Sequence, residues 1–129
     1  MSGGRDESGG KTERRARLRR GTVGELVAAA LLMAKGYRIL ARRHRTPHGE
    51  IDIIAVRRGR VAFVEVKRRG TQAQAEAALT PHQAERIARA AEHWLARHPR
   101  YRERDMGLDA ILIVPRRWPE HLENVLAGV

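Results

Sequence analysis

An apolar stripe at helical spacing lies near the start of the chain. Its members recur at intervals of three and four residues, which places them on one face of an α-helix. They are Val23, Leu26, Val27, Ala30, Leu31 and Ala34. Gly36 follows at the position of a C-terminal capping glycine. The pattern predicts a helix that builds from Arg14, ends near Gly36 and packs this stripe against a core.

Alternating and continuous apolar runs then predict strands. Alternation is typical of a strand with one wet face, and an unbroken apolar run is typical of a strand buried on both faces. The segment 46–49 reads as a turn, and Arg58-Gly59 is the centre of a tight hairpin turn. The predicted strands are 37–42, 50–56, 61–67 and 108–114.

A second helix is predicted from Thr80-Pro81, where threonine caps the N-terminus and proline takes the first helical position. Its apolar stripe is Ala84, Ile87, Ala88, Ala91 and Leu95. Residues 70–79 have little pattern and are predicted as a loop, and the tail at 121–127 as a short helix or strand. The helix is long enough to cross over and bring the last strand parallel to the third. The order predicts an α/β domain whose mixed sheet, an antiparallel meander plus one parallel strand, is flanked by helices.

Composition and charge narrow the class of partner. The formal net charge is +11, and only three of the 26 basic residues are lysine. This balance favours a polyanion, nucleic acid before membrane. The absence of cysteine excludes disulfides, thiolate zinc sites and a cysteine nucleophile. No apolar run approaches the roughly 18 residues of a membrane span, so a cytoplasmic protein is expected. Residues 1–13 are predicted to be disordered and 14–129 to form one domain.

The predicted hairpin carries acids among residues that otherwise read as core. Its register places Asp52 opposite Glu65 and Glu50 opposite Lys67. Like charges directly opposite destabilise a sheet pair, so a cation, a shared proton or an arginine must offset the repulsion. Mg²⁺ fits, because it takes carboxylate oxygens, waters and a backbone carbonyl such as that of Val66. The other interpretation is a solvated face with Glu50 and Lys67 as an ordinary cross-strand pair.

Lys67 lies two residues beyond Glu65 on the same predicted face. Its ammonium is suited to polarising an attacking water or stabilising charge on a phosphate. A compact ammonium differs chemically from a guanidinium, so a lysine here, in an arginine-dominated chain, hints at a chemical requirement.

The runs GEIDIIA at 49–55 and FVEVKRR at 63–69 resemble the PD-(D/E)XK nuclease signature, an acid followed by E-x-K across a hairpin. More narrowly, the chain resembles the YraN-like family of small bacterial proteins of unassigned function. Supporting segments are 21–25 and 36–40, and the resemblance covers about residues 17–126. It implies a restriction-endonuclease-like fold similar to that of Holliday-junction resolvases.

The resemblance also implies roles for individual residues. Asp52 and Glu65 are implied as ligands of Mg²⁺ or Mn²⁺, and Lys67 as a catalytic residue. Glu25 matches a helix acid that points into the same site and is counted as a third metal ligand. Glu50 is implied as a supporting residue that pairs with Lys67.

Three further positions have two interpretations. Glu25 also closes a capping-box pattern that begins at Thr22. Gln83 resembles a catalytic-site polar residue on the second helix, yet Thr80 to Gln83 is another capping box. Asp109 matches an acid in a family R-F-D-V pattern whose arginine and phenylalanine are absent here, so a structural role at the sheet edge is considered. The six histidines show no metal-ligand spacing, and most are expected at the surface, with His82 near the site.

Together these observations predict a metal-dependent nuclease that hydrolyses phosphodiester bonds in DNA, including branched or structured DNA. The alternatives are a non-catalytic nucleic-acid-binding module on the same fold, or an assembly role with an acidic protein partner. Resolvase-like nucleases act as dimers, so a homodimer is considered, with Trp94 and Trp118 as interface or core aromatics. The arginines expected to grip the nucleic-acid backbone are Arg38, Arg42, Arg43, Arg45, Arg68 and Arg69.

Overall fold

The computed structural model describes residues 23–128. The predicted disorder of 1–13, the helix start near Arg14 and the cap at Thr22 lie outside these residues. The first helix is described from 23 to 34. The elements that follow are β1 (Arg38–Thr46), β2 (Gly49–Arg57), β3 (Arg60–Arg68), α2 (Gln72–Ala77), α3 (Pro81–Arg97), η1 (Pro99–Tyr101), β4 (Asp105–Ile113), β5 (Glu120–Leu122) and η2 (Val125–Gly128).

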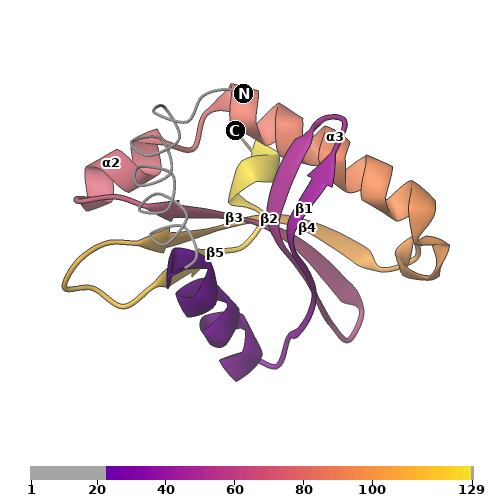
Figure 1. The fold of residues 1–129 in the computed structure, drawn as a ribbon, viewed down its shortest axis with the longest axis horizontal. Coiled ribbons are helices and arrows are strands. Elements are labelled where there is room, and N and C mark those ends of the chain that lie inside the picture. Colours follow the sequence, from indigo (N-terminus) through magenta and orange to yellow (C-terminus); the bar gives the residue numbers. More distant parts are fainter. Residues whose placement is uncertain (1–22, 129) are drawn as a thin grey trace, which may run out of the picture.

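The five strands form one mixed sheet in the order β1-β2-β3-β4-β5. β3 and β4 are parallel, and the other neighbours are antiparallel. α3 lies between β3 and β4 in the chain and covers one face of the sheet, while the first helix covers the other (Figure 1). The predicted mixed α/β sheet is therefore confirmed. None of the helices within residues 23–128 is long and apolar enough to cross a membrane.

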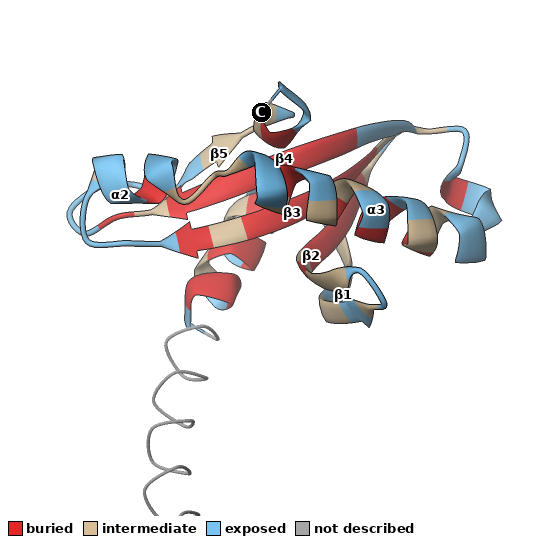
Figure 2. Cartoon of the chain, turned by 90° about the horizontal axis from the view of Figure 1, so that it is seen from above, coloured by how far each residue is buried: buried red, intermediate tan, exposed pale blue. Residues whose placement is uncertain are grey.

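Each face of the sheet has its own hydrophobic core. On the α3 side, Phe63 packs edge-on against Trp94 with ring centroids 5.7 Å apart, and Trp94 is only 3% exposed. On the first-helix side, Leu32 packs against Ile53 and Val64. The central strands are accordingly buried along most of their length, whereas the chain segments at the sheet ends are exposed (Figure 2). Of the two tryptophans, Trp94 belongs to the core.

The buried face of the first helix differs from the predicted stripe. Ala28, Ala29 and Leu32 face the sheet, whereas Val23 and Leu26 are about half exposed. The stretch is apolar on more than one side, so its periodicity fits two overlapping faces, and the small alanines allow the closer approach to the sheet. The predicted C-terminal glycine is confirmed. Gly36 has φ +94°, and the next N–H, that of Tyr37, donates to the Leu32 carbonyl at 2.9 Å.

Two predicted segments are wrong in extent or type. Residues 70–79 contain α2, capped by the Thr71 side chain, which accepts from the Gln74 N–H at 3.1 Å. Only Ala75 of α2 is buried, so the helix leaves no apolar stripe in the sequence. β4 begins at Asp105, before the apolar run, because parallel pairing with β3 extends into polar residues. The tail contains both a strand, β5, and a short 3₁₀ helix, η2.

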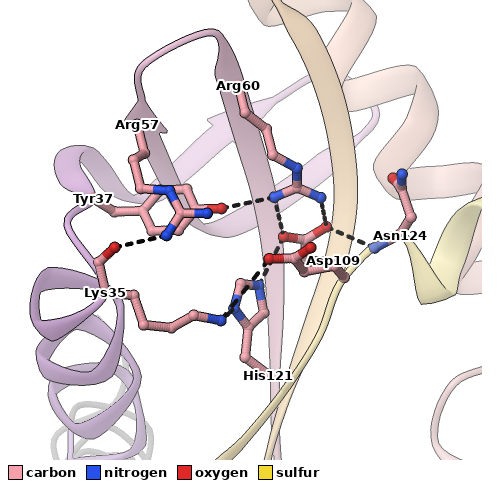
Figure 3. Close-up of polar contacts among 8 residues, drawn as sticks. Lys35, Tyr37, Arg57, Arg60, Asp109, His121 and Asn124 are labelled. Atoms are coloured by element: carbon pink, nitrogen blue, oxygen red, sulfur yellow. Dashed lines mark hydrogen bonds and ion pairs between the residues drawn. The ribbon is translucent and has the colours of Figure 1, made fainter.

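Asp109 is fully buried inside β4 and ties several elements together (Figure 3). Arg60 donates to its carboxylate through both terminal nitrogens at 2.8 Å, and the Asn124 N–H donates at 2.9 Å. His121 Nε2 donates at 2.8 Å, and this side chain is 2% exposed, so His121 is not one of the histidines at the surface. Gly107 makes room for the pair, since a Cβ there would meet the Arg60 guanidinium. Asp109 is therefore a structural residue in the sheet interior.

Candidate active site

The β2–β3 hairpin has the predicted register up to the point where the acids begin. Arg57 pairs with Arg60 across the turn, and Ile53 pairs with Val64. The regular ladder ends there. One residue further, Asp52 Oδ2 accepts a hydrogen bond from the Val66 N–H at 2.7 Å. The Asp52 carboxylate thus takes the place of a strand carbonyl, which fixes it against β3 beside Glu65.

The pKa of Asp52 is raised to about 7, chiefly by burial and next by the charge of Glu65, although the hydrogen bond from the Val66 N–H lowers it. Glu25 adds a smaller repulsion and Lys67 a smaller attraction. The predicted repulsion between the hairpin acids is therefore present. Near neutral pH the site favours a proton or another positive charge on this carboxylate.

Glu65 lies in a buried cluster of charges. Its Oε2 atom is 3.0 Å from Lys67 Nζ, and both side chains are 8% exposed. The predicted common face of these two residues is confirmed by this contact. The other oxygen, Glu65 Oε1, is buried and has no hydrogen-bond partner. A carboxylate oxygen in this state is an open acceptor for a cation or a donor.

Arg86, on α3, completes the cluster and was missed from the sequence. One Arg86 nitrogen lies 3.4 Å from Glu65 Oε2, and the other donates to the Glu50 carbonyl at 3.3 Å. Gly49 permits this approach, because a Cβ there would lie 2.6 Å from Arg86 Nη1. The available signal was the spacing of Arg86 three residues after Gln83, on the same helix face. In a chain with 26 basic residues, one arginine did not stand out.

Gln83 forms only half of the proposed capping box. Its backbone N–H donates to Thr80 Oγ1 at 3.2 Å, which confirms the N-cap. Its side-chain oxygen, Gln83 Oε1, is buried without a hydrogen-bond partner, so the reciprocal bond to Thr80 is not formed. The amide is therefore available for another contact, and its site role stays a prediction.

Glu25 is carried by the first helix to the same cavity as Asp52. Both residues line a space of about 660 Å³, together with Val66, Arg68 and Arg69. Glu25 Oε2 accepts from Arg43 Nε at 2.6 Å. Glu65 and Lys67 are not among the residues that line this space. The charged residues thus form two groups: Asp52 and Glu25 line the cavity, and Glu65 and Lys67 lie beside α3. The charges of both groups act on the Asp52 carboxylate.

The predicted pairing of Glu50 with Lys67 is wrong. Glu50 instead lies 3.8 Å from Arg45 on the neighbouring strand, and Lys67 pairs with Glu65. The physical reason is the end of the ladder at Ile53, since beyond it the two strands no longer hold the register that would set Glu50 opposite Lys67.

Comparison with known proteins identifies the family. Residues 24–113 match "Uncharacterised protein family UPF0102". The chain belongs to this family. A UPF0102 protein of Bradyrhizobium diazoefficiens is 53% identical over 120 residues, which cover 93% of this chain and 90% of that protein. A UPF0102 protein of Parvibaculum lavamentivorans is 53% identical over 110 residues, covering 84% and 82%. The predicted membership of a YraN-like family of bacterial proteins is confirmed.

The arginines predicted to contact nucleic acid in this UPF0102 chain fall into three groups. Arg43 is committed to Glu25, and the hydrogen bond with that carboxylate raises its pKa. Arg68 and Arg69 are exposed and line the cavity with Asp52. The remaining predicted contact residues are exposed along β1: Arg38, Arg42 and Arg45.

The donor chemistry of the site fits a hard divalent cation. Asp52 and Glu65 supply carboxylates, and one oxygen of Glu65 has no other partner. Among residues 23–128, no three His, Cys, Asp or Glu side chains are grouped so that they could hold a metal by themselves. Asp52, Glu65 and Glu25 are thus not gathered as a three-ligand set, and any ion here must share its remaining positions with water, backbone or substrate oxygens.

Proposed function

We propose that this UPF0102 protein is a Mg²⁺- or Mn²⁺-dependent nuclease that hydrolyses phosphodiester bonds in DNA, with branched or structured DNA among its substrates. The observation that carries the proposal is a half-buried carboxylate beside a buried carboxylate–ammonium pair: Asp52 has a pKa raised to about 7, and Glu65 contacts Lys67 at 3.0 Å. Such an arrangement is costly for a purely structural site.

The metal is assigned to Asp52 and Glu65. A divalent ion held there would polarise the scissile phosphate and lower the pKa of a bound water, which would supply a nucleophile at neutral pH. The protein supplies the rest. Lys67 places an ammonium where negative charge develops on the phosphate, and the open Gln83 Oε1 accepts a hydrogen bond from a water and so orients it.

The surface charge supports a nucleic-acid substrate. Two acids alone repel phosphate, so a phosphodiester needs compensating cations at the site. Arg68 and Arg69 line the cavity that Asp52 opens onto, and the net charge of the chain is +11. These arginines bind the backbone on either side of the reacting phosphate and supply affinity without sequence preference.

The direct test is cleavage of linear, flapped and four-way-junction DNA with Mg²⁺ or Mn²⁺. Glu65→Gln and Lys67→Ala should each lose about 100-fold or more in rate, while DNA binding measured in EDTA changes little. Glu85→Gln is the matched control, since Glu85 is 63% exposed in a surface pair with Arg89.

Cleavage that survives Glu65→Gln would contradict the assignment, because the activity would then come from elsewhere. Tight, salt-dependent binding with no product under either ion would instead favour the non-catalytic nucleic-acid-binding module.

A further inference from the structure

Trp118 is the most exposed large hydrophobic side chain among residues 23–128, with 91% of its surface accessible. Tryptophan usually buries most of its ring, as Trp94 does in the core, whereas the ring of Trp118 is left in solvent. The side chain stands on the loop between β4 and β5. Both faces of its indole are therefore open to a flat ligand.

The loop that carries Trp118 is constrained. Pro115 begins it and Pro119 follows the tryptophan, and each proline fixes its own φ. The Arg117 N–H donates to the Val114 carbonyl at 3.3 Å, which closes a turn. Arg117 also reaches Gln72 of α2 at 3.4 Å. The indole is thus presented by a loop tied at both ends and at its middle, which lowers the entropy lost when it binds a ligand.

Trp118 also lines a second cavity, whose volume is about 490 Å³. The apolar part of its lining comes from the buried Leu112 and Val114 together with Trp118 and Pro119. Gln72, Arg117 and Glu120 supply the polar groups.

This cavity adjoins the candidate active site. Val114 lines both the indole cavity and the cavity that holds Asp52. α2 and the β4–β5 loop lie at the same end of the sheet, where β3 and β4 both end (Figure 1). A strand of nucleic acid whose phosphate is at the acids can therefore reach the indole within a few nucleotides.

We propose that Trp118 stacks on an unpaired nucleobase of the substrate, next to the cleaved phosphate; this rests on the proposed function. Every base has a π-face, so stacking on an indole is tolerant of sequence. Gln72 and Glu120, joined by a hydrogen bond of 3.1 Å, line the same cavity as the ring, and the exposed Arg116 and Arg117 flank the ring for the adjoining phosphates. A fully paired duplex keeps its bases inside the stack, so the substrate class is DNA with unpaired bases, such as flaps, gaps or junctions.

Charge favours a nucleic acid over a second copy of the chain as the occupant. Arg116 and Arg117 are exposed directly beside the indole, and the chain carries a net charge of +11. Two copies that met at this loop would bring these like charges together, which costs free energy. A phosphodiester backbone neutralises them.

Intrinsic fluorescence tests the proposal, because the chain has only two tryptophans and one is buried. The full-length protein is titrated in EDTA at low salt with an oligothymidylate, a blunt duplex and a flapped duplex, while anisotropy of labelled DNA reports binding independently. We expect the single strand and the flap to quench the wild type and the blunt duplex to leave emission unchanged. Trp118→Ala should bind the single strand about tenfold more weakly, with blunt-duplex binding unchanged.

Two variants serve as controls. Trp118→Phe keeps a stacking ring and should retain most single-strand binding while losing the quenching. Met33→Ala removes a side chain on the first helix that is also largely exposed. It should change neither the quenching of tryptophan fluorescence nor the anisotropy of labelled DNA.

The outcomes separate this inference from the proposed function. Single-stranded or flapped DNA that binds without quenching, or equal binding of the single strand by wild type and Trp118→Ala, overturns the stacking role and leaves the nuclease proposal standing. Quenching by unpaired DNA with no cleavage under Mg²⁺ or Mn²⁺ supports the stacking role and counts against the nuclease. A blue shift of emission that grows with protein concentration in the absence of DNA would overturn the inference in favour of self-association.

Discussion

Asp52 Oδ2 accepts a hydrogen bond from the backbone N–H of Val66 at 2.7 Å, and the regular β2–β3 ladder ends at this hydrogen bond. The carboxylate occupies the position of a strand carbonyl, so it is held, half-buried, against the residue that follows Glu65. Without this bond two neighbouring acids would separate to reduce their repulsion. The bond therefore explains how the fold retains a pair of like charges that its stability would favour losing.

Replacement of Asp52 by asparagine should stabilise the protein at high pH. The folded pKa of Asp52 is raised to about 7, whereas an unfolded aspartate has a pKa of about 4. The folded state therefore loses stability as pH rises from about 4 to 7, and the penalty is complete above 7. Asp52→Asn should raise the free energy of unfolding by about 1–3 kcal/mol at pH 8 and by little at pH 4. Urea unfolding at both pH values measures this. Asp105→Asn, at an exposed position, is the control, and an equal gain at both pH values would disprove the titration account.

Asp109 should have the opposite pH dependence. Burial alone raises its pKa, but hydrogen bonds from Arg60, His121 and Asn124 outweigh burial and lower it to about 2. Its contribution to stability is present above the unfolded pKa of about 4 and is lost as pH falls through about 2. Asp109→Asn should cost about 3–5 kcal/mol at pH 7, since Arg60 loses its buried partner. Chemical denaturation gives the value, and a loss below 1 kcal/mol would show that the network is not essential.

Gly49→Ala should destabilise the turn between β1 and β2 and displace Arg86. Gly49 has φ +124°, and a Cβ there would lie 2.6 Å from Arg86 Nη1. Backbone strain of this kind costs about 1–3 kcal/mol, and displacement of Arg86 removes a cation from Glu65. Gly59→Ala is the matched control, because a Cβ at Gly59 has no neighbour within 4 Å. Thermal unfolding of both variants is the measurement, and similar melting temperatures would refute the steric argument.

Arg69 should contribute one phosphate contact to DNA binding. It is exposed and lines the cavity with Asp52. Arg69→Ala should reduce the slope of log K against log salt concentration by about 0.9 for duplex DNA. Arg102→Ala changes an exposed arginine beyond η1 and should leave the slope unaltered. Anisotropy titrations over a range of salt give both slopes. Equal slopes for the two variants would mean that DNA does not lie along this cavity.

The sequence predicts those parts of the fold in which one local pattern dominates. Thr80-Pro81 begins α3 and Gly36 ends the first helix, because capping chemistry is local. The turn at Arg58-Gly59 fixes the β2–β3 register, because a tight turn allows few alternatives. The buried face of the first helix was not predictable, since Ala28 and Leu32 compete with an equally apolar stripe through Leu26.

The candidate site was predictable in its residues and less so in its contacts. Asp52, Glu65 and Lys67 follow from acids and a lysine placed among core residues. The end of the ladder at Ile53 is a tertiary event, and beyond it Glu50 no longer lies opposite Lys67. Arg86 enters only because α3 packs over Gly49, a relationship between segments far apart in the chain.

The most direct test of the account is calorimetric titration of Mn²⁺ and Mg²⁺ into the protein at pH 8, alone and with a short DNA duplex. Wild type and Glu85→Gln should bind the ions, and the Asp52→Asn/Glu65→Gln double variant should not. Binding should weaken from pH 8 to pH 6, because a proton on Asp52 then competes with the ion. Equal binding by the double variant, or no binding by wild type even with DNA present, would contradict the assignment of a two-carboxylate metal site.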